Sequence, residues 1–146
     1  MKQYGLVKTL KDGDNEIKLC GNALTFILYK SYFGRDLLND IINFAKKNAG
    51  ENTLKNLNAF GIKAVEDIDK LSDEQTAQVL GSLDNFSFDS EFVLNFIAAL
   101  MATAQYPAKP DIAEVICAIP PHFIVDQSVI GELMEFLSLF ISQKKG

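Results

Sequence analysis

The sequence predicts a mainly helical domain of about five to six helices with a small β-hairpin at its N-terminus. Two patterns predict this fold: residues 1–20 partly alternate around a turn-rich segment, and apolar residues recur at helical spacing from residue 22 onward. The chain has 146 residues, of which 48% are hydrophobic and 23% charged, and these values are typical of one soluble globular domain. We therefore expect residues 1–146 to form a single domain.

Residues 1–20 are predicted to form the hairpin. Two short runs of partly alternating polarity, residues 6–10 and 16–19, flank the turn-forming residues 11–15. An isolated hairpin is only marginally stable in water. We therefore expect its apolar face to lie on the helices that follow or to pair with another chain.

Residues 22–48 are predicted to form a pair of neighbouring helices. Asn22 is an N-cap for the first helix, Gly34 is a left-handed C-cap, and Asp36 caps the second helix. The predicted apolar stripe of the first helix is Leu24, Ile27, Leu28 and Tyr32. The predicted core face of the second helix is Leu37, Leu38, Ile41, Ile42 and Phe44.

Residues 49–71 are more polar and are predicted to be loop, with a weak helix around residues 53–60. The remainder, residues 72–143, is predicted to be helical. Ser72 and Gln75 have the spacing of a capping box, which predicts a short helix that extends to about residue 83.

Three further helices are predicted. Asp89 and Ser90 begin a strongly apolar helix that ends before Pro107 and should be the central buried helix. A short helix begins at Pro110 and Asp111 and runs through residue 119, and Asp126 caps the last helix, residues 127–142. The expected core includes Leu24, Leu28, Phe33, Ile41, Phe96, Leu100 and Leu137.

The sequence offers little that could carry catalysis. His122 is the only histidine and is expected to lie at the surface or to pack, and Cys20 and Cys117 lie in apolar segments, where we expect small buried side chains. No phosphate-binding glycine loop, nucleophile motif or metal-ligand spacing is present. We therefore expect no enzymatic activity, no catalytic residue, no cofactor and no bound metal.

Charge and hydropathy narrow the classes of partner. The formal net charge is −5, and Arg35 is the single arginine among 14 basic residues, which disfavours nucleic acid as a partner. No apolar run reaches the ~18 residues that a membrane span requires. We therefore expect no membrane association and a cytoplasmic location.

The last helix is unusually apolar. Beside its main stripe it carries Phe136, Leu139 and Phe140. Two interpretations stay open: the helix is fully buried in the domain, or part of this face contacts another chain.

Two blocks of the sequence resemble one protein family. Residues 18–41 end with Tyr29, Phe33, Gly34 and Asp36 in a Tyr-Lys-x-x-Phe-Gly-x-Asp pattern, and residues 95–114 join an apolar helix to a Pro-Asp-x-x-Glu step. Both blocks resemble the tail assembly chaperones of tailed phages and prophages of Gram-positive bacteria. The family often has a tryptophan after the second block, where this chain has Val-Ile.

The resemblance implies a function without catalysis. A tail assembly chaperone binds the aggregation-prone tape measure protein during tail morphogenesis, with the tail tube protein as a further client. It implies that the protein acts in the cytoplasm of the bacterial host and is not part of the mature virion. The resemblance also makes Tyr29, Phe33, Gly34 and Asp36 fold-defining, while Phe136, Leu139 and Phe140 are our candidates for the client surface and for self-association.

Two other interpretations stay open. The protein could be a small adaptor or regulatory protein of a mobile element that binds a protein partner, or, less favoured, an enzyme without a recognisable motif. The family also often has a longer form made by −1 ribosomal slippage, and Gln143, Lys144 and Lys145 permit a slippery codon string. The alternative for these residues is a charged, frayed helix end.

Overall fold

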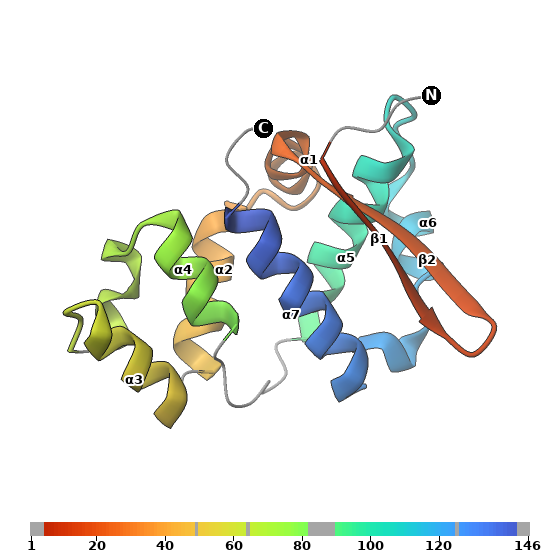
Figure 1. The fold of residues 1–146 in the computed structure, drawn as a ribbon. Coiled ribbons are helices and arrows are strands. Elements are labelled where there is room, and N and C mark those ends of the chain that lie inside the picture. Colours follow the sequence, from red (N-terminus) through yellow and green to blue (C-terminus); the bar gives the residue numbers. More distant parts are fainter. Residues whose placement is uncertain (1–4, 49, 64, 82–89, 125, 143–146) are drawn as a thin grey trace.

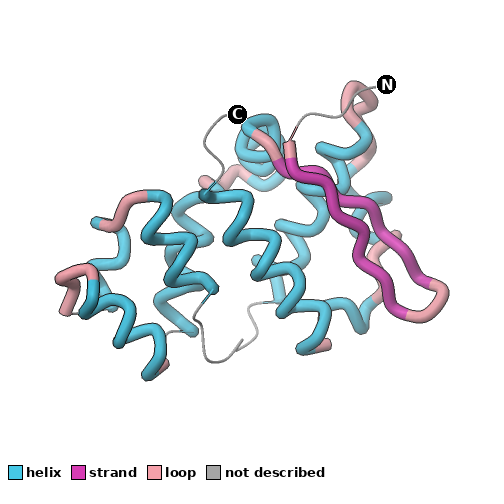
Figure 2. Tube along the Cα trace, in the orientation of Figure 1, coloured by secondary structure: helices cyan, strands magenta, loops and turns pink. Residues whose placement is uncertain are grey.

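The computed structural model describes residues 5–48, 50–63, 65–81, 90–124 and 126–142. In these ranges the chain forms a two-stranded hairpin followed by a helical body, as predicted (Figures 1 and 2). The elements are β1 (Leu6–Asp12), β2 (Asn15–Gly21), α1 (Ala23–Phe33), α2 (Leu37–Asn48), α3 (Glu51–Ala59), η1 (Val65–Lys70), α4 (Asp73–Gly81), α5 (Ser90–Gln105), α6 (Ile112–Cys117), η2 (Pro121–Ile124) and α7 (Gln127–Ser142).

The hairpin is antiparallel and its strands are longer than predicted. Its register pairs residue 6 with residue 21 and residue 12 with residue 15, and Gly13 occupies the turn with a positive φ of 64°. The buried side chains Leu10, Ile17 and Leu19 belong to the main core. Strand β2 packs against α5 and β1 against α7, which confirms that the apolar face of the hairpin lies on the helices.

Helix α1 begins and ends at the predicted caps but presents a different face. Asn22 accepts a hydrogen bond from the Leu24 amide at 2.8 Å. The most buried side chains of α1 are Thr25 and Tyr29, whereas Ile27 of the predicted stripe is 64% exposed. The predicted stripe is wrong because apolar residues occur all around this helix, so their spacing does not select one face.

A hydroxyl pair joins α1 to α5. The Oγ1 atoms of Thr25 and Thr103 are 2.9 Å apart, and both side chains are buried. Thr103 Oγ1 donates to the carbonyl oxygen of Ala99 at 2.8 Å, and Thr25 Oγ1 accepts from the Asn22 amide at 3.2 Å. These bonds form a continuous polar link, the threonine link, inside an otherwise apolar contact.

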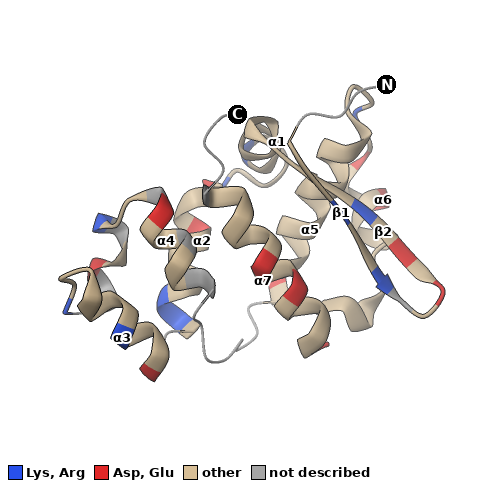
Figure 3. Ribbon diagram, viewed as in Figure 1, with Lys and Arg blue, Asp and Glu red and all other residues tan. Residues whose placement is uncertain are grey.

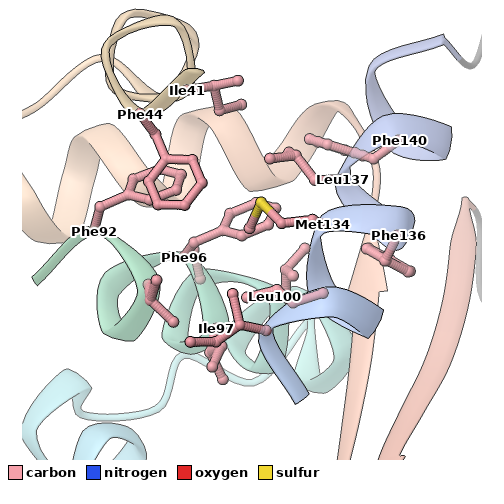
Figure 4. Packing of buried hydrophobic residues seen from close by; sticks show 14 of the residues in the cluster. Ile41, Phe44, Phe92, Phe96, Ile97, Leu100, Met134, Phe136, Leu137 and Phe140 are labelled. Carbon is pink, nitrogen blue, oxygen red and sulfur yellow. The ribbon is translucent and has the colours of Figure 1, made fainter. Parts of the chain in front are cut away.

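The core lies between α5, α7 and α2 (Figure 4). Eleven of the sixteen residues of α5 are buried, as expected for the central helix. A row of neighbouring rings crosses the core from α2 to α1, with centroid distances of 5.1 to 6.3 Å. In order, the row is Phe44, Phe92, Phe96, Phe140 and Phe26.

The predicted core is confirmed in part. Ile41, Phe96, Leu100 and Leu137 are fully buried. Leu24, Leu28 and Phe33 are only partly buried, because α1 lies at the edge of the core and turns Thr25 and Tyr29 inward. On α2, Leu38 of the predicted face is 37% exposed, and the polar Asp40 is buried instead.

Residues 50–81 are more regular than predicted. The predicted weak helix around residues 53–60 is present as α3, and η1 lies in the remainder of the segment predicted as loop, so the described residues contain seven α-helices. Helix α3 buries Thr53 and Leu57, and Thr53 Oγ1 accepts from the Gly50 amide at 3.1 Å. The capping box is confirmed, since the Gln75 amide donates to Ser72 Oγ at 3.2 Å and the Ser72 amide donates to Gln75 Oε1 at 3.1 Å.

The last helices begin near the predicted caps. Asp111 precedes α6, which is shorter than predicted, and Asp126 Oδ1 accepts from the Ser128 amide at 2.8 Å. Helix α7 has the predicted bounds. The predicted start at Asp89 and the segment Gln143–Lys145 lie outside the described residues.

Candidate functional site

The segment that resembles the chaperone family forms a tight corner between α1 and α2. Gly34 has φ 67° and ψ 20°, and its amide donates to the Lys30 carbonyl oxygen at 2.8 Å. Asp36 Oδ2 accepts from the Asn39 amide at 2.9 Å at the start of α2. Both predicted caps are therefore present, and they fix α1 and α2 as adjacent elements.

Inside this corner, three polar side chains form a network. Tyr29 Oη donates to Asp40 Oδ2 at 2.7 Å, and Arg35 donates from Nε to Oδ2 and from Nη2 to Oδ1, also at 2.7 Å. Tyr29 is fully buried and Asp40 is 7% exposed, whereas the Arg35 side chain is about half exposed. The ring of Phe33 meets the Tyr29 ring edge-on at 5.2 Å. Of the four family positions, Tyr29 thus binds the buried carboxylate directly, and Phe33 packs against Tyr29.

The electrostatics of the network follow from these bonds. The hydrogen bond from Arg35 is the largest cause that lowers the pKa of Asp40, and the bond from Tyr29 adds to it. Burial acts in the opposite direction but does not prevail. The same pairing raises the pKa of Arg35 above its ordinary value. Asp40 is therefore held as a carboxylate at neutral pH.

Sequence reasoning did not single out Asp40 or assign a role to Arg35. Asp40 follows the motif by four residues on a helix, where a carboxylate is expected to face water. The available signal was Arg35, because it is the single arginine of the chain and stands inside the Phe-Gly-x-Asp pattern. A unique arginine beside a helix start suggests a bidentate carboxylate partner on the next turn.

A polar cavity of about 230 Å³ adjoins the network. It lies between α2 and the first turns of α5, and Tyr29, Arg35 and Asp40 form part of its wall. Asn95 and Lys46 line it as well. The family-like corner thus borders a hollow that could hold a small polar group.

The predicted client surface on α7 requires a correction. Phe136 is 4% exposed and Phe140 is 6% exposed, whereas Leu139 is 57% exposed. Both rings lie against Gly21 at the end of β2, and Phe140 also stacks on Phe26 with ring centroids 5.2 Å apart. Of the two interpretations, burial in the domain holds for Phe136 and Phe140, because the hairpin and α1 cover them, and Leu139 is left as the exposed candidate for contact with another chain.

Other candidate residues do not assemble into a reactive site. Cys20 is buried as expected and burial raises the pKa of its thiol, whereas Cys117 is exposed, contrary to expectation. His122 is partly buried, with its ring edge-on to Phe123. Within the described ranges, no three histidine, cysteine or acidic residues are placed to hold a metal ion.

Two surface-related properties concern nucleic acid and membranes as partners: the distribution of charge and the length of the apolar helices. On the face shown in Figure 3, the hairpin carries both basic and acidic residues, and the charges on α7 are acidic. Of the helices in the described part of the chain, none is long and apolar enough to cross a membrane.

Comparisons of the chain with protein-family models, curated proteins and solved structures found no match. The resemblance in residues 18–41 and 95–114 therefore stays a prediction.

Proposed function

We propose that the protein is a tail assembly chaperone of a tailed phage or prophage. In this role it binds the tape measure protein, with the tail tube protein as a further client, in the cytoplasm of the bacterial host. The observation that carries the proposal is the block of residues 18–41, whose Tyr29, Phe33, Gly34 and Asp36 follow the family pattern. The function requires binding and release, and no catalytic residue.

The structure suggests where client contact should be tested. Leu139 is the exposed member of the predicted surface, and Ile27 is exposed on α1. Each is the chain neighbour of one ring of the stacked pair Phe26 and Phe140. An apolar side chain on an exposed helix face can pack against an amphipathic helix of a partner. We therefore propose that the edge between α1 and α7 contacts the client, and that self-association would use the same edge.

Co-expression with the tape measure protein of the same genetic element tests the function. We expect the soluble fraction of the tape measure protein to rise several-fold and the two proteins to co-purify. Purified tails should lack the chaperone by mass spectrometry. Absence of any binding would favour the adaptor or regulatory interpretation.

A matched pair of variants tests the surface separately from the function. Leu139→Ser should weaken co-purification, whereas Leu54→Ser, at another partly exposed leucine on α3, should not. Both variants should unfold at nearly the wild-type denaturant concentration, since surface substitutions have small effects on stability. Equal binding by the two variants would place the client surface elsewhere and leave the chaperone function standing.

A further inference from the structure

The cavity beside the Arg35–Asp40 pair is polar in an otherwise apolar fold. Its wall combines residues of the α1–α2 corner with Glu91 and Asn95 of α5. A water molecule occupies roughly 30 Å³ in the liquid. A cavity of about 230 Å³ therefore has room for a small organic group and not for a folded segment.

Asn95 is the feature that points to a ligand. It is 8% exposed, and among the residues that the structure describes its side chain has no hydrogen-bond partner. No fully enclosed side-chain nitrogen or oxygen lacks a partner in this part of the chain, so the Asn95 amide opens into the cavity. Because its amide atoms are open to the cavity, they can hydrogen-bond to water or to a polar group that enters it. A group inside the cavity would supply the missing bonds.

The charges of the wall favour an anion. Arg35 uses Nε and one N–H of Nη2 for Asp40, which leaves its other guanidinium N–H groups as donors. Lys46 is partly buried and makes no ion pair within the described ranges, and Lys47 adds a further positive charge. The acidic groups of the wall are Asp40, which is paired, and Glu91. The wall therefore has one more positive than negative group, in a chain of net charge −5.

We propose that this cavity binds a carboxylate group. A carboxylate is planar and carries one negative charge, so it matches the excess of one positive group, and its two oxygens can accept from an arginine and an amide together. A phosphate dianion would bring a second negative charge toward Glu91 and Asp40. The carboxylate belongs either to a free small molecule or to an acidic side chain of a protein. This proposal does not rest on the chaperone function.

Titration with propionate, followed by proton–nitrogen NMR of the folded protein, tests the proposal. We expect the side-chain amide signals of Asn95 to shift and to saturate at millimolar propionate. Propionamide, which has the same shape without the charge, and sodium chloride at equal ionic strength should cause no saturating shift. Equal shifts with either control would overturn the proposal.

Two variants and one control assign the binding to the cavity. Lys46→Gln, a surface change that leaves the core intact, should weaken propionate binding at least threefold. Asn95→Leu, which lacks the side-chain amide and is followed on the backbone amide signals of the cavity wall, should abolish binding. Lys109→Gln, which is exposed and outside the cavity wall, should bind as the wild type does. Unchanged binding by Lys46→Gln would also overturn the proposal.

A peptide arm distinguishes the two sources of the carboxylate. The blocked tripeptide acetyl-Gly-Glu-Gly-amide is compared with its glutamine counterpart in the same titration. Saturating shifts with the glutamate peptide alone support an acidic side chain of a protein as the ligand. Shifts with propionate and with neither peptide support a free small carboxylate.

Discussion

The two ends of the helical body are built differently. In the half around α5 and α7, apolar side chains fill most inward positions, and five phenylalanine rings form a continuous row. In residues 50–81, the fully buried apolar side chains that the structure describes are Leu57 of α3, Ile68 of η1 and Val79 of α4. The first half therefore packs through many described apolar side chains, and the second through fewer of them.

Removing the central ring of the row should have the largest effect. Phe96 is fully buried, and its ring lies 5.8 Å from that of Phe92 and 6.3 Å from that of Phe140. Phe96→Ala should lower the free energy of unfolding by about 3 to 5 kcal/mol, because it leaves a cavity in a tightly packed region. Urea unfolding measures the change. A loss below about 1 kcal/mol would mean that α5 is peripheral.

Truncating a buried side chain in residues 50–81 should lower the free energy of unfolding by less, and its effect should be local. Leu57→Ala should cost about 2 to 3 kcal/mol, near the lower end for a buried leucine, because the polar surroundings of α3 can relax around the gap. Hydrogen exchange should accelerate in residues 50–81 and stay slow in α5. Equal acceleration in both regions would show that they unfold as one unit.

Adding a side-chain atom at Gly21 should test how tightly the half around α5 and α7 is packed. A Cβ atom on Gly21 would lie 2.8 Å from Cδ1 of Phe140 and 3.2 Å from Cε1 of Phe136. Gly21→Ala should therefore cost about 1 to 3 kcal/mol, as expected for overpacking. Thermal unfolding of this variant and of the double variant with Phe140→Leu provides the check. The second change should recover part of the loss, and additive losses would argue against the contact.

The network of Tyr29, Arg35 and Asp40 should contribute least to the free energy of unfolding, and the pH dependence of that contribution should identify it. The pKa of Asp40 is lower in the folded than in the unfolded chain, so its contribution is fully present above the unfolded value of about 3.9 and is lost as the pH falls through the folded value. At pH 6, Asp40→Asn should cost about 1 to 2 kcal/mol. The difference from the wild type should shrink as the pH falls below about 4. A difference that stays constant as the pH falls would show that protonation of Asp40 does not contribute to acid unfolding.

The same comparison explains what could be predicted from the sequence. The hairpin, α5 and α7 were predictable because their apolar spacing is dense and their caps, such as Asp126, are strong local signals. Residues 49–71 were predicted as loop with a weak helix around residues 53–60, because polar residues and glycines interrupt the apolar pattern, and η1 was not predicted. Their helical state depends on tertiary contacts with α2 and α4.

The candidate site was less predictable than the fold. Gly34 and Asp36 could be assigned as caps because capping is a local property of the chain. The role of Asp40 depends on Tyr29, which lies eleven residues earlier, and the hollow near Asn95 depends on how α5 meets α2. Burial of Phe136 and Phe140 was not evident either, because an apolar helix surface does not indicate whether its own chain or another chain covers it.

The hydrogen bonds of the threonine link between α1 and α5 all run in one donor-to-acceptor direction. A hydroxyl group has one proton. Because Thr103 donates its proton to Ala99, the proton between the two hydroxyls must come from Thr25, and the Asn22 amide completes a one-way sequence of donors. A rotation of α1 about its axis would break this order, which apolar packing alone would tolerate. The rotation of α1 about its axis, and with it the inward position of Tyr29, is therefore set by this chain of hydrogen bonds, which runs from the Asn22 amide through the two hydroxyls to the Ala99 carbonyl.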